Sequence, residues 1–201
     1  LMITANTTAG STVAGTTTKF TTSQDVLSGG AGDDTFNGVL IKSGDTGTTV
    51  APGDQVDGGA GTDTVNISVS GLHAASYTLE ALDTDNIEKV FVSNYETNDS
   101  RTTTVSGALF DSSVATVGLS SSSSTGDTIF SGLTKTVDAE MRNGSGNLEV
   151  KYDGAQSVTG TADTQNLTVS ALTGGVFTVA SVENVNIKSE LSKSTLDDVV
   201  P

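Results

Sequence analysis

The chain has 201 residues, which fits one domain or two small ones, and only 34% of them are hydrophobic and 4% aromatic. Its formal net charge of −15 argues against nucleic acid as a partner, because affinity for phosphates comes from Lys and Arg. The sequence has no Cys and a single His (His73), which excludes disulfides, thiolate catalysis, cysteine zinc sites and a histidine metal cluster.

The N-terminal residues, LMITANTTAG, lack the positive and hydrophobic regions of a Sec signal peptide. A start at Leu1 and an end at DDVVP indicate a piece cut from a longer chain. No run of about 18 apolar residues occurs, so we expect no membrane-spanning helix. Thr and Val, which favour strands, alternate with Gly, Asn and Asp, which favour turns, and no long stretch has a helical period. The chain is therefore predicted to be all-β.

Two units of thirteen residues are nearly identical: DVLSGGAGDDTFN at residues 25–37 and DQVDGGAGTDTVN at residues 54–66, an offset of 29 residues. Each contains the pattern G-G-x-G-x-D-x-U-x, where U is apolar, and this pattern resembles the calcium-binding repeat of RTX proteins. Glycines permit tight turns with inward carbonyls, and Ca²⁺ prefers six to eight oxygen ligands at about 2.3–2.6 Å. The apolar residue, Phe36 or Val65, is expected to begin a strand with its side chain inside.

The resemblance implies a set of calcium ligands. By position in the motif, Asp34 and Asp63 match the side-chain ligands. The turns that donate carbonyls contain Gly30, Gly32, Gly59 and Gly61. Asp25 and Asp54 match the half-turns that precede these turns and are further candidate ligands. Ordinary Gly-rich hairpin turns without a metal are the alternative, whereas phosphate binding is disfavoured because the turns are acidic and match neither GxGxxG nor GK[ST].

The offset between the units also predicts how the chain is organised. An RTX β-roll has two nonapeptides per coil, roughly 18 residues. The observed 29 residues then imply an excursion of roughly 11 residues, and we expect residues 38–53 to carry it as an inserted loop or hairpin.

A weaker repeat follows. GTDTVNISVS (61–70) resembles GTADTQNLTVS (160–170), and NIEKVFVS (86–93) resembles SVENVNIKS (181–189). Residues of about 54–95 and 155–190 therefore resemble two copies of one module, of which the second lacks the GGAG turn. Asp163 would take the place of Asp63, either as a relic site or as a plain turn aspartate.

Short alternating strands are expected between these copies, with valines recurring at Val117, Val137, Val150, Val169 and Val185. This spacing suits a calcium-stapled β-solenoid, in which each coil buries its apolar face on the next; a β-sandwich with RTX-type turns is the alternative. GDTIF (126–130) is interpreted as a degenerate half-turn carrying Asp127. We divide the chain into an N-terminal turn with its loop (1–53), a first β module (54–110) and a second, degenerate module (111–201).

No catalytic motif of the GxSxG, HExxH or Walker type occurs. Asp138 and Glu140 are expected on one face of a strand, with Val137, Ala139 and Met141 on the other. Two neighbouring carboxylates are the machinery of glycoside hydrolysis, but a solvated acidic face explains them without further assumptions. We therefore predict that the chain is not an enzyme.

The order of TTSQDVLSGGAGDDTFNG, APGDQVDGGAGTDTVNISVS and DNIEKVFVSN resembles RTX-type bacterial surface-layer (S-layer) proteins and large RTX adhesins. The resemblance covers residues 20–95 and is fainter over 155–190. It implies type I secretion, an extracellular location on a bacterial surface, Ca²⁺ as structural cofactor and assembly with copies of itself, with cell-surface polysaccharide as a further candidate partner. The alternatives are an adhesin module that recognises a surface or glycan, and a β-roll appendage of a secreted hydrolase.

Overall fold

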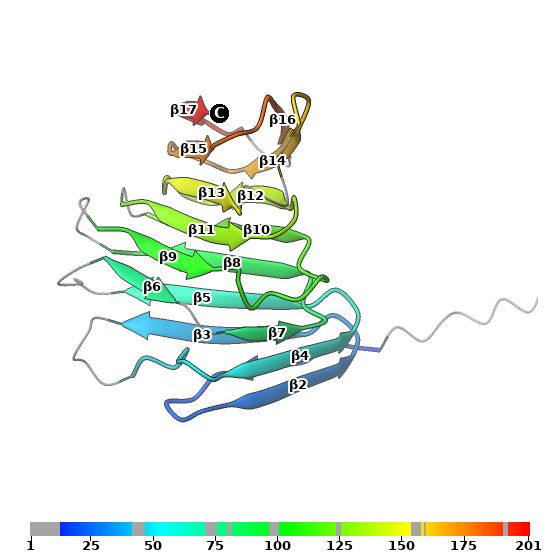
Figure 1. Cartoon of the computed structure of the whole chain (residues 1–201). Helices are drawn as coiled ribbons and strands as arrows, with labels where there is room; N and C mark the ends of the chain where they lie inside the picture. The colour runs from blue at the N-terminus through cyan, green and yellow to red at the C-terminus, as the bar shows by residue number, and fades with distance from the viewer. Residues whose placement is uncertain are drawn as a thin grey trace, which may run out of the picture.

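The computed structural model describes residues 13–41, 47–70, 76–79, 82–96, 101–123, 126–153, 158, 160–190 and 193–201. In these ranges the chain consists of β-strands, turns and irregular segments, and contains no helix. Accordingly, nothing in these ranges is a helix long and apolar enough to span a membrane. The strands wind into a β-solenoid of about six turns, which confirms the predicted fold class. Successive coils stack from β2 (Val26–Ala31) at the bottom of Figure 1 to β16 (Asn184–Ser189) and β17 (Asp198–Val200) at the top.

Three parallel sheets form the walls of the solenoid, and all strand pairs within them are parallel. Sheet A has eight strands, in the order β1 (Thr17–Lys19), β3 (Thr35–Ile41), β5 (Thr64–Ser70), β8 (Lys89–Asn94), β10 (Thr116–Ser120), β12 (Asp138–Arg142), β14 (Thr164–Ser170) and β16. Sheet B has three strands: β2, β4 (Gln55–Ala60) and β7 (Asp83–Asp85). Sheet C has six strands: β6 (Tyr77–Leu79), β9 (Thr103–Ser106), β11 (Thr128–Leu133), β13 (Leu148–Tyr152), β15 (Val176–Val179) and β17.

The length of one coil can be measured along sheet A. Phe36 pairs with Val65, which pairs with Val90, so these coils contain 29 and 25 residues. The offset between the two glycine units is therefore one complete circuit of the solenoid. From the sequence we expected a coil of two nonapeptides with an added excursion, and this expectation was wrong.

Residues 38–53, the predicted excursion, form part of the coil itself. Strand β3 continues to Ile41 and pairs with β5, because its alternating apolar residues place Leu40 in the core. The chain then returns beside the same strand, where the N–H of Thr49 donates to the carbonyl of Val39 (2.8 Å), and Val50 is fully buried. Residues 38–41 and 47–53 therefore belong to the coil, and residues 42–46 of the predicted excursion lie outside the described ranges.

The core is a set of apolar columns that run along the solenoid axis. In sheet A one column contains Phe36, Val65, Val90, Val117, Ala139 and Leu167, all with 1% exposure or less. In sheet C the corresponding column contains Val105, Phe130, Val150 and Val179. Strands with the alternating pattern place every second side chain in these columns, and each coil completes the apolar face of its neighbour. Of the recurring valines named above, Val117, Val137, Val150 and Val169 are buried, and Val185 is half-buried.

The solenoid changes shape along its axis. In the described ranges, sheet B is present only in the first coils. In the next coil, Phe110 pairs with Thr84 of β7 through a single parallel bridge. The later coils have sheets A and C as their two walls. Both described ends expose apolar side chains: Val26 of β2 is 78% exposed and Ile187 of β16 is 52% exposed.

Candidate calcium-binding turns

The two glycine units fold into the same structure, stacked one coil apart. β2 pairs with β4 so that Gly30 lies beside Gly59. Both residues have positive φ, 125° and 89°, as do Gly32 (99°) and Gly61 (147°). A Cβ atom at Gly59 or Gly61 would overlap the carbonyl of Gly30 or Gly32 below it, so these positions require glycine both for backbone conformation and for the close approach of coils.

Asp34 and Asp63 lie at the corner between sheets B and A, with 1% and 0% exposure. Oδ1 of Asp34 accepts hydrogen bonds from the backbone N–H (2.6 Å) and the hydroxyl (2.7 Å) of Thr16. Oδ1 of Asp63 accepts the N–H of Asp34 (2.6 Å), and Oε2 of Glu88 accepts the N–H of Asp63 (2.7 Å). A ladder of carboxylates thus runs up this corner, and each one caps the backbone of the coil before it.

The second oxygen of each aspartate is different. Oδ2 of Asp34 and Oδ2 of Asp63 are buried and have no hydrogen-bond partner. A Cβ atom at Gly29 would overlap Oδ2 of Asp34 and the carbonyl oxygen of Gly58. Gly58 repeats this arrangement one coil later, with Oδ2 of Asp63 and the carbonyl oxygen of Asn86. The missing side chains of these two glycines therefore leave space that a carboxylate oxygen and a carbonyl oxygen share.

Gly29 and Gly58 were not among the predicted site residues. The sequence pattern assigns the ligand turn to the glycines with positive φ, whereas these two glycines face the aspartates directly. Their signal in the sequence is the doubled glycine, of which the first member provides space and the second provides the left-handed backbone.

The two aspartates differ in electrostatics although they are equivalent in position. Hydrogen bonds from the hydroxyl and then the N–H of Thr16 lower the pKa of Asp34, against the effect of burial. Burial raises the pKa of Asp63; the N–H of Asp34 opposes this rise, and the charges of Glu88, Asp34 and Asp33 add to it. Of the two aspartates, Asp63 is thus the one at which a negative charge is less favourable.

The oxygen atoms at this corner are of the kind that calcium binds, because carboxylates and backbone carbonyls are hard ligands. Within the described ranges, no group of three or more Asp, Glu or His side chains is arranged to hold a metal ion. A cation here would therefore depend on carbonyl oxygens as well as on the two aspartates. Such a mixed donor set agrees with the ligand chemistry that the motif implies.

Asp25 and Asp54 lie at the opposite ends of β2 and β4 from this corner, and their oxygens are already used. Asp25 accepts the N–H (2.7 Å) and hydroxyl (2.8 Å) of Thr21. Asp54 accepts the N–H groups of Asp25 (2.9 Å) and Ala51 (2.7 Å). Each carboxylate closes the bend that leads into sheet B. Hydrogen bonds account for both residues, and their role as calcium ligands stays a prediction.

Asp163 stands in the same relation to its neighbours as Asp63. Its N–H donates to Oε2 of Glu183 (2.9 Å), as that of Asp63 does to Glu88, and both aspartates directly precede a strand of sheet A. Its Oδ2, however, accepts the N–H of Gly160 (2.9 Å). Asp163 thus keeps the position that Asp63 has in its coil, but its Oδ2 is not left unpaired.

The remaining candidates fall elsewhere. Asp127 precedes β11, and its Oδ1 accepts the side-chain amide of Asn147 (3.3 Å). Asp138 and Glu140 lie on the outer face of β12 with Ala139 and Met141 inside, as the alternation predicts. His73 lies outside the described residues.

No protein-family model, curated protein or solved structure matches this chain. A solenoid fold alone does not define a function, because one fold hosts many. Function must therefore be argued from the residues of the site.

Proposed function

We propose that this chain is a calcium-dependent structural element of a bacterial surface layer, located outside the cell, that assembles with copies of itself. The observation that carries the proposal is the pair of buried, unpaired oxygens, Oδ2 of Asp34 and Oδ2 of Asp63, each next to a backbone carbonyl. The repeated turn that contains them resembles the RTX calcium repeat. A buried carboxylate oxygen without a partner is costly, and a bound cation removes that cost.

Calcium would be held at this corner by Asp34, Asp63 and the carbonyls of Gly58 and Asn86. There it would neutralise charge that the ladder concentrates and would join adjacent coils. Bound calcium would also reduce repulsion across the whole chain, because a net charge of −15 opposes a compact state. At concentrations of 10 to 100 times the dissociation constant, each bound ion adds about 1.4 to 2.7 kcal/mol to the free energy of unfolding.

A structural role also suits the rest of the molecule. Its sheets are continuous walls of parallel strands. Within the described ranges no strand pairs with the outer edge of β2 or of β16, and these two strands carry the exposed apolar residues Val26 and Ile187. Free strand edges pair readily with other chains. The lack of a catalytic motif in the sequence agrees with a role in assembly.

The test is to compare the chain in excess calcium and in excess EGTA. We expect calcium to raise the melting temperature, and electron microscopy to show ordered arrays only in calcium. A melting temperature that EGTA leaves unchanged contradicts the calcium dependence. Calcium-dependent folding without any array contradicts the assembly role and leaves the adhesin module as the better candidate.

A further inference from the structure

The sequence contains two Asn-Gly pairs, Asn37-Gly38 and Asn143-Gly144, and the fold places them in different surroundings. Asparagine loses its side-chain amide most readily when glycine follows it, because the backbone nitrogen of glycine attacks the amide carbon without hindrance from a Cβ atom. The attack requires the peptide unit between the two residues to rotate. The hydrogen bonds of that unit therefore decide which of the two asparagines can react in the folded chain.

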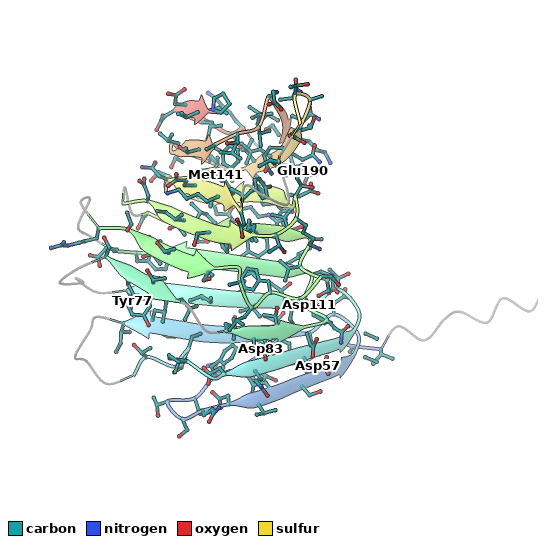
Figure 2. All side chains as sticks on the ribbon, viewed as in Figure 1. Asp57, Tyr77, Asp83, Asp111, Met141 and Glu190 are labelled. Atoms are coloured by element: carbon teal, nitrogen blue, oxygen red, sulfur yellow. The ribbon has the colours of Figure 1, made fainter. Side chains whose placement is uncertain are left out.

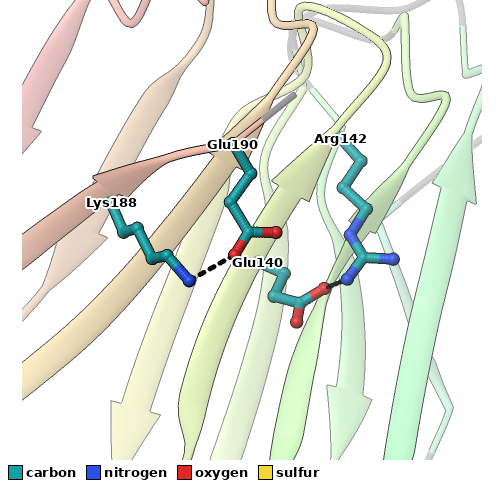
Figure 3. A network of polar contacts seen from close by, with 4 residues as sticks. All are labelled: Glu140, Arg142, Lys188 and Glu190. Carbon is teal, nitrogen blue, oxygen red and sulfur yellow. Dashed lines mark ion pairs between the residues drawn. The ribbon is translucent and has the colours of Figure 1, made fainter. Parts of the chain in front are cut away.

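Asn143 and Gly144 form the bend that follows strand β12. The strand ends at Arg142, whose guanidinium pairs with Glu140; Figure 3 shows this ion pair beside that of Lys188 and Glu190. Asn143 itself is exposed and has a φ of 52°, a left-handed conformation that asparagine adopts more readily than most other residues. The chain thus leaves sheet A at this asparagine.

The peptide unit between Asn143 and Gly144 has no hydrogen bond within the described ranges. The carbonyl of Asn143 accepts none, the N–H of Gly144 donates none, and the side-chain amide of Asn143 has no partner there either. The units on both sides are held. The N–H of Asn143 donates to the carbonyl of Ser170 (2.9 Å), and that of Ser145 donates to the carbonyl of Ser122 (3.0 Å). The unit at the reaction site can therefore rotate without breaking a hydrogen bond of its own.

Asn37 and Gly38 lie instead inside β3, between β1 and β5. The carbonyl of Asn37 accepts the N–H of Phe20 (3.0 Å), and its side-chain Oδ1 accepts Nδ2 of Asn66 (3.2 Å). Gly38 is buried and pairs in register with Ile67. Rotation of this peptide unit would require β3 to separate from its neighbours, so the sheet protects Asn37.

We propose that Asn143 is a site of spontaneous deamidation, and that the reaction loosens the last coils of the solenoid. The nitrogen of Gly144 loses its proton to hydroxide and attacks Cγ of Asn143. The new C–N bond closes a succinimide ring, and the side-chain nitrogen leaves as ammonia. Water then opens the ring at one of its two carbonyls, which gives aspartate or isoaspartate. The net reaction consumes one water and involves no oxidation or reduction.

Isoaspartate changes the backbone itself, because the chain then passes through Cβ of residue 143 and gains a methylene group. It also adds one negative charge to a chain whose net charge is already −15. The N–H of Thr173 donates to the carbonyl of Gly144 (2.8 Å), and Ser145 is bonded to Ser122, so the bend joins the coils above and below it. A longer bend shifts these bonds. This site goes beyond the proposed structural role and does not depend on it, because it contains none of the candidate calcium ligands.

The experiment is to incubate the full chain in excess calcium in mildly alkaline buffer and to follow both asparagines by peptide mapping with mass spectrometry. Isoaspartate is counted by enzymatic methyl transfer. Synthetic peptides of residues 33–39 and 139–145, in which both units rotate freely, should deamidate at similar rates. In the folded chain Asn143 should react more slowly than in its peptide, because Gly144 packs against the carbonyl of Ser122. It should still react at least about tenfold faster than Asn37, whose unit requires a larger opening of the fold.

The proposal is overturned if both peptides react while Asn143 does not react in the folded chain, or if Asn37 reacts there as fast as Asn143. Asn143→Gln is the matched variant, because its longer side chain closes a larger ring much more slowly. Its side chain is exposed, so the fold should be retained, which circular dichroism checks. The methyl transfer at residue 143 should disappear in this variant.

The melting temperature tests the effect on the coils. Incubation should lower it in the unmodified chain and leave it unchanged in Asn143→Gln. Equal melting temperatures of the two incubated proteins, with Asn143 converted, would overturn the loosening of the last coils. Failure of the calcium proposal is a separate result, because it is read from fresh protein in calcium and in EGTA.

Discussion

The N–H of Asp34 donates to Oδ1 of Asp63 at 2.6 Å, although the two residues are 29 positions apart in the chain. This bond joins the same position of two successive coils. Together with the bonds to Thr16 and Glu88 it makes one corner of the solenoid a continuous chain of carboxylate caps. These hydrogen bonds stabilise the corner, whereas the negative charges gathered there destabilise it. The first two predictions follow from this conflict.

Asp63→Asn should stabilise the folded chain in the absence of calcium and weaken the stabilisation that calcium provides. The amide keeps an oxygen that can accept the N–H of Asp34, and it removes a buried charge whose neighbours are acidic, so in EGTA the variant should be more stable than the unmodified chain. It also removes a proposed calcium ligand, so the gain in melting temperature on adding calcium should become much smaller. Thermal unfolding in both conditions measures this.

Asp163→Asn is the control for this variant. Asp163 has the same backbone relation to Glu183, but its Oδ2 accepts a hydrogen bond and is not left unpaired. We expect its calcium response to match that of the unmodified chain. An equally weakened response in Asp163→Asn would show that the second module has kept a working site.

The calcium-free chain should become more stable as the pH falls below neutral. The pKa of Asp63 is raised in the folded state, so the folded chain binds a proton more readily than the unfolded chain, and stability is lost as the pH rises through the folded pKa. The pKa of Asp34 is lowered, so its contribution is lost only at still lower pH, as the pH falls below about 3.8. Denaturant unfolding in EGTA from pH 7 to pH 3 should therefore show a maximum in the acid range.

This maximum should depend on Asp63. In Asp63→Asn, the rise in the free energy of unfolding on acidification should be reduced, and its fall at the lowest pH should remain. A rise of the same size in both proteins would place its origin outside Asp63. The surface along sheet B and the bend that follows it also carries Asp57 and Asp83, which are exposed, and Asp111, which is half-buried (Figure 2).

Much of the fold could be predicted from local pattern. The alternation around Phe36, Val65 and Val150 indicates strands with one buried face, and the doubled glycines mark the turns. The path of the coil could not be predicted in the same way. Its length depends on how far β3 extends and on the return of residues 48–50, which pack on that strand through contacts that no local pattern encodes.

The sequence named the four aspartates of the candidate turns but could not tell them apart, and it did not name Gly29 and Gly58. The sequence pattern treats Asp25, Asp34, Asp54 and Asp63 alike, as acidic residues beside glycine turns. Only the packing of coils separates them, because it supplies donors to both oxygens of Asp25 and Asp54 and to one oxygen of Asp34 and Asp63.

Gly58→Ala should be more destabilising than Gly30→Ala. The φ angle of Gly58 is not positive, but an added Cβ would overlap the carbonyl of Asn86 and the carboxylate of Asp63, which cannot move without shifting the next coil. We expect a loss of about 3 kcal/mol or more in the free energy of unfolding. Gly30 has a φ of 125° and open space around its Cα, so alanine there costs only backbone strain, about 1–2 kcal/mol. Denaturant unfolding of both variants in calcium compares them, and equal losses would show that space at Gly58 is not required.

Tyr152 should make the chain sensitive to alkali because its hydroxyl is buried. The hydroxyl of Tyr152 donates to Oε1 of Gln165 (2.5 Å), which is 1% exposed, and accepts the N–H of Val137 (3.3 Å). Burial raises the pKa of Tyr152 above its ordinary value of 10.0, so its contribution to stability is complete below about pH 10 and is lost as the pH rises through the folded pKa.

At neutral pH, Tyr152→Phe should lower the free energy of unfolding by about 1–3 kcal/mol, because Oε1 of Gln165 stays buried without its donor. The same variant should lose less stability than the unmodified chain between pH 9 and pH 11. Tyr77, whose pKa burial also raises, is unchanged in both proteins and cancels in the comparison. If Tyr152→Phe and the unmodified chain lose stability equally in alkali, burial does not raise the pKa of Tyr152 in the folded chain.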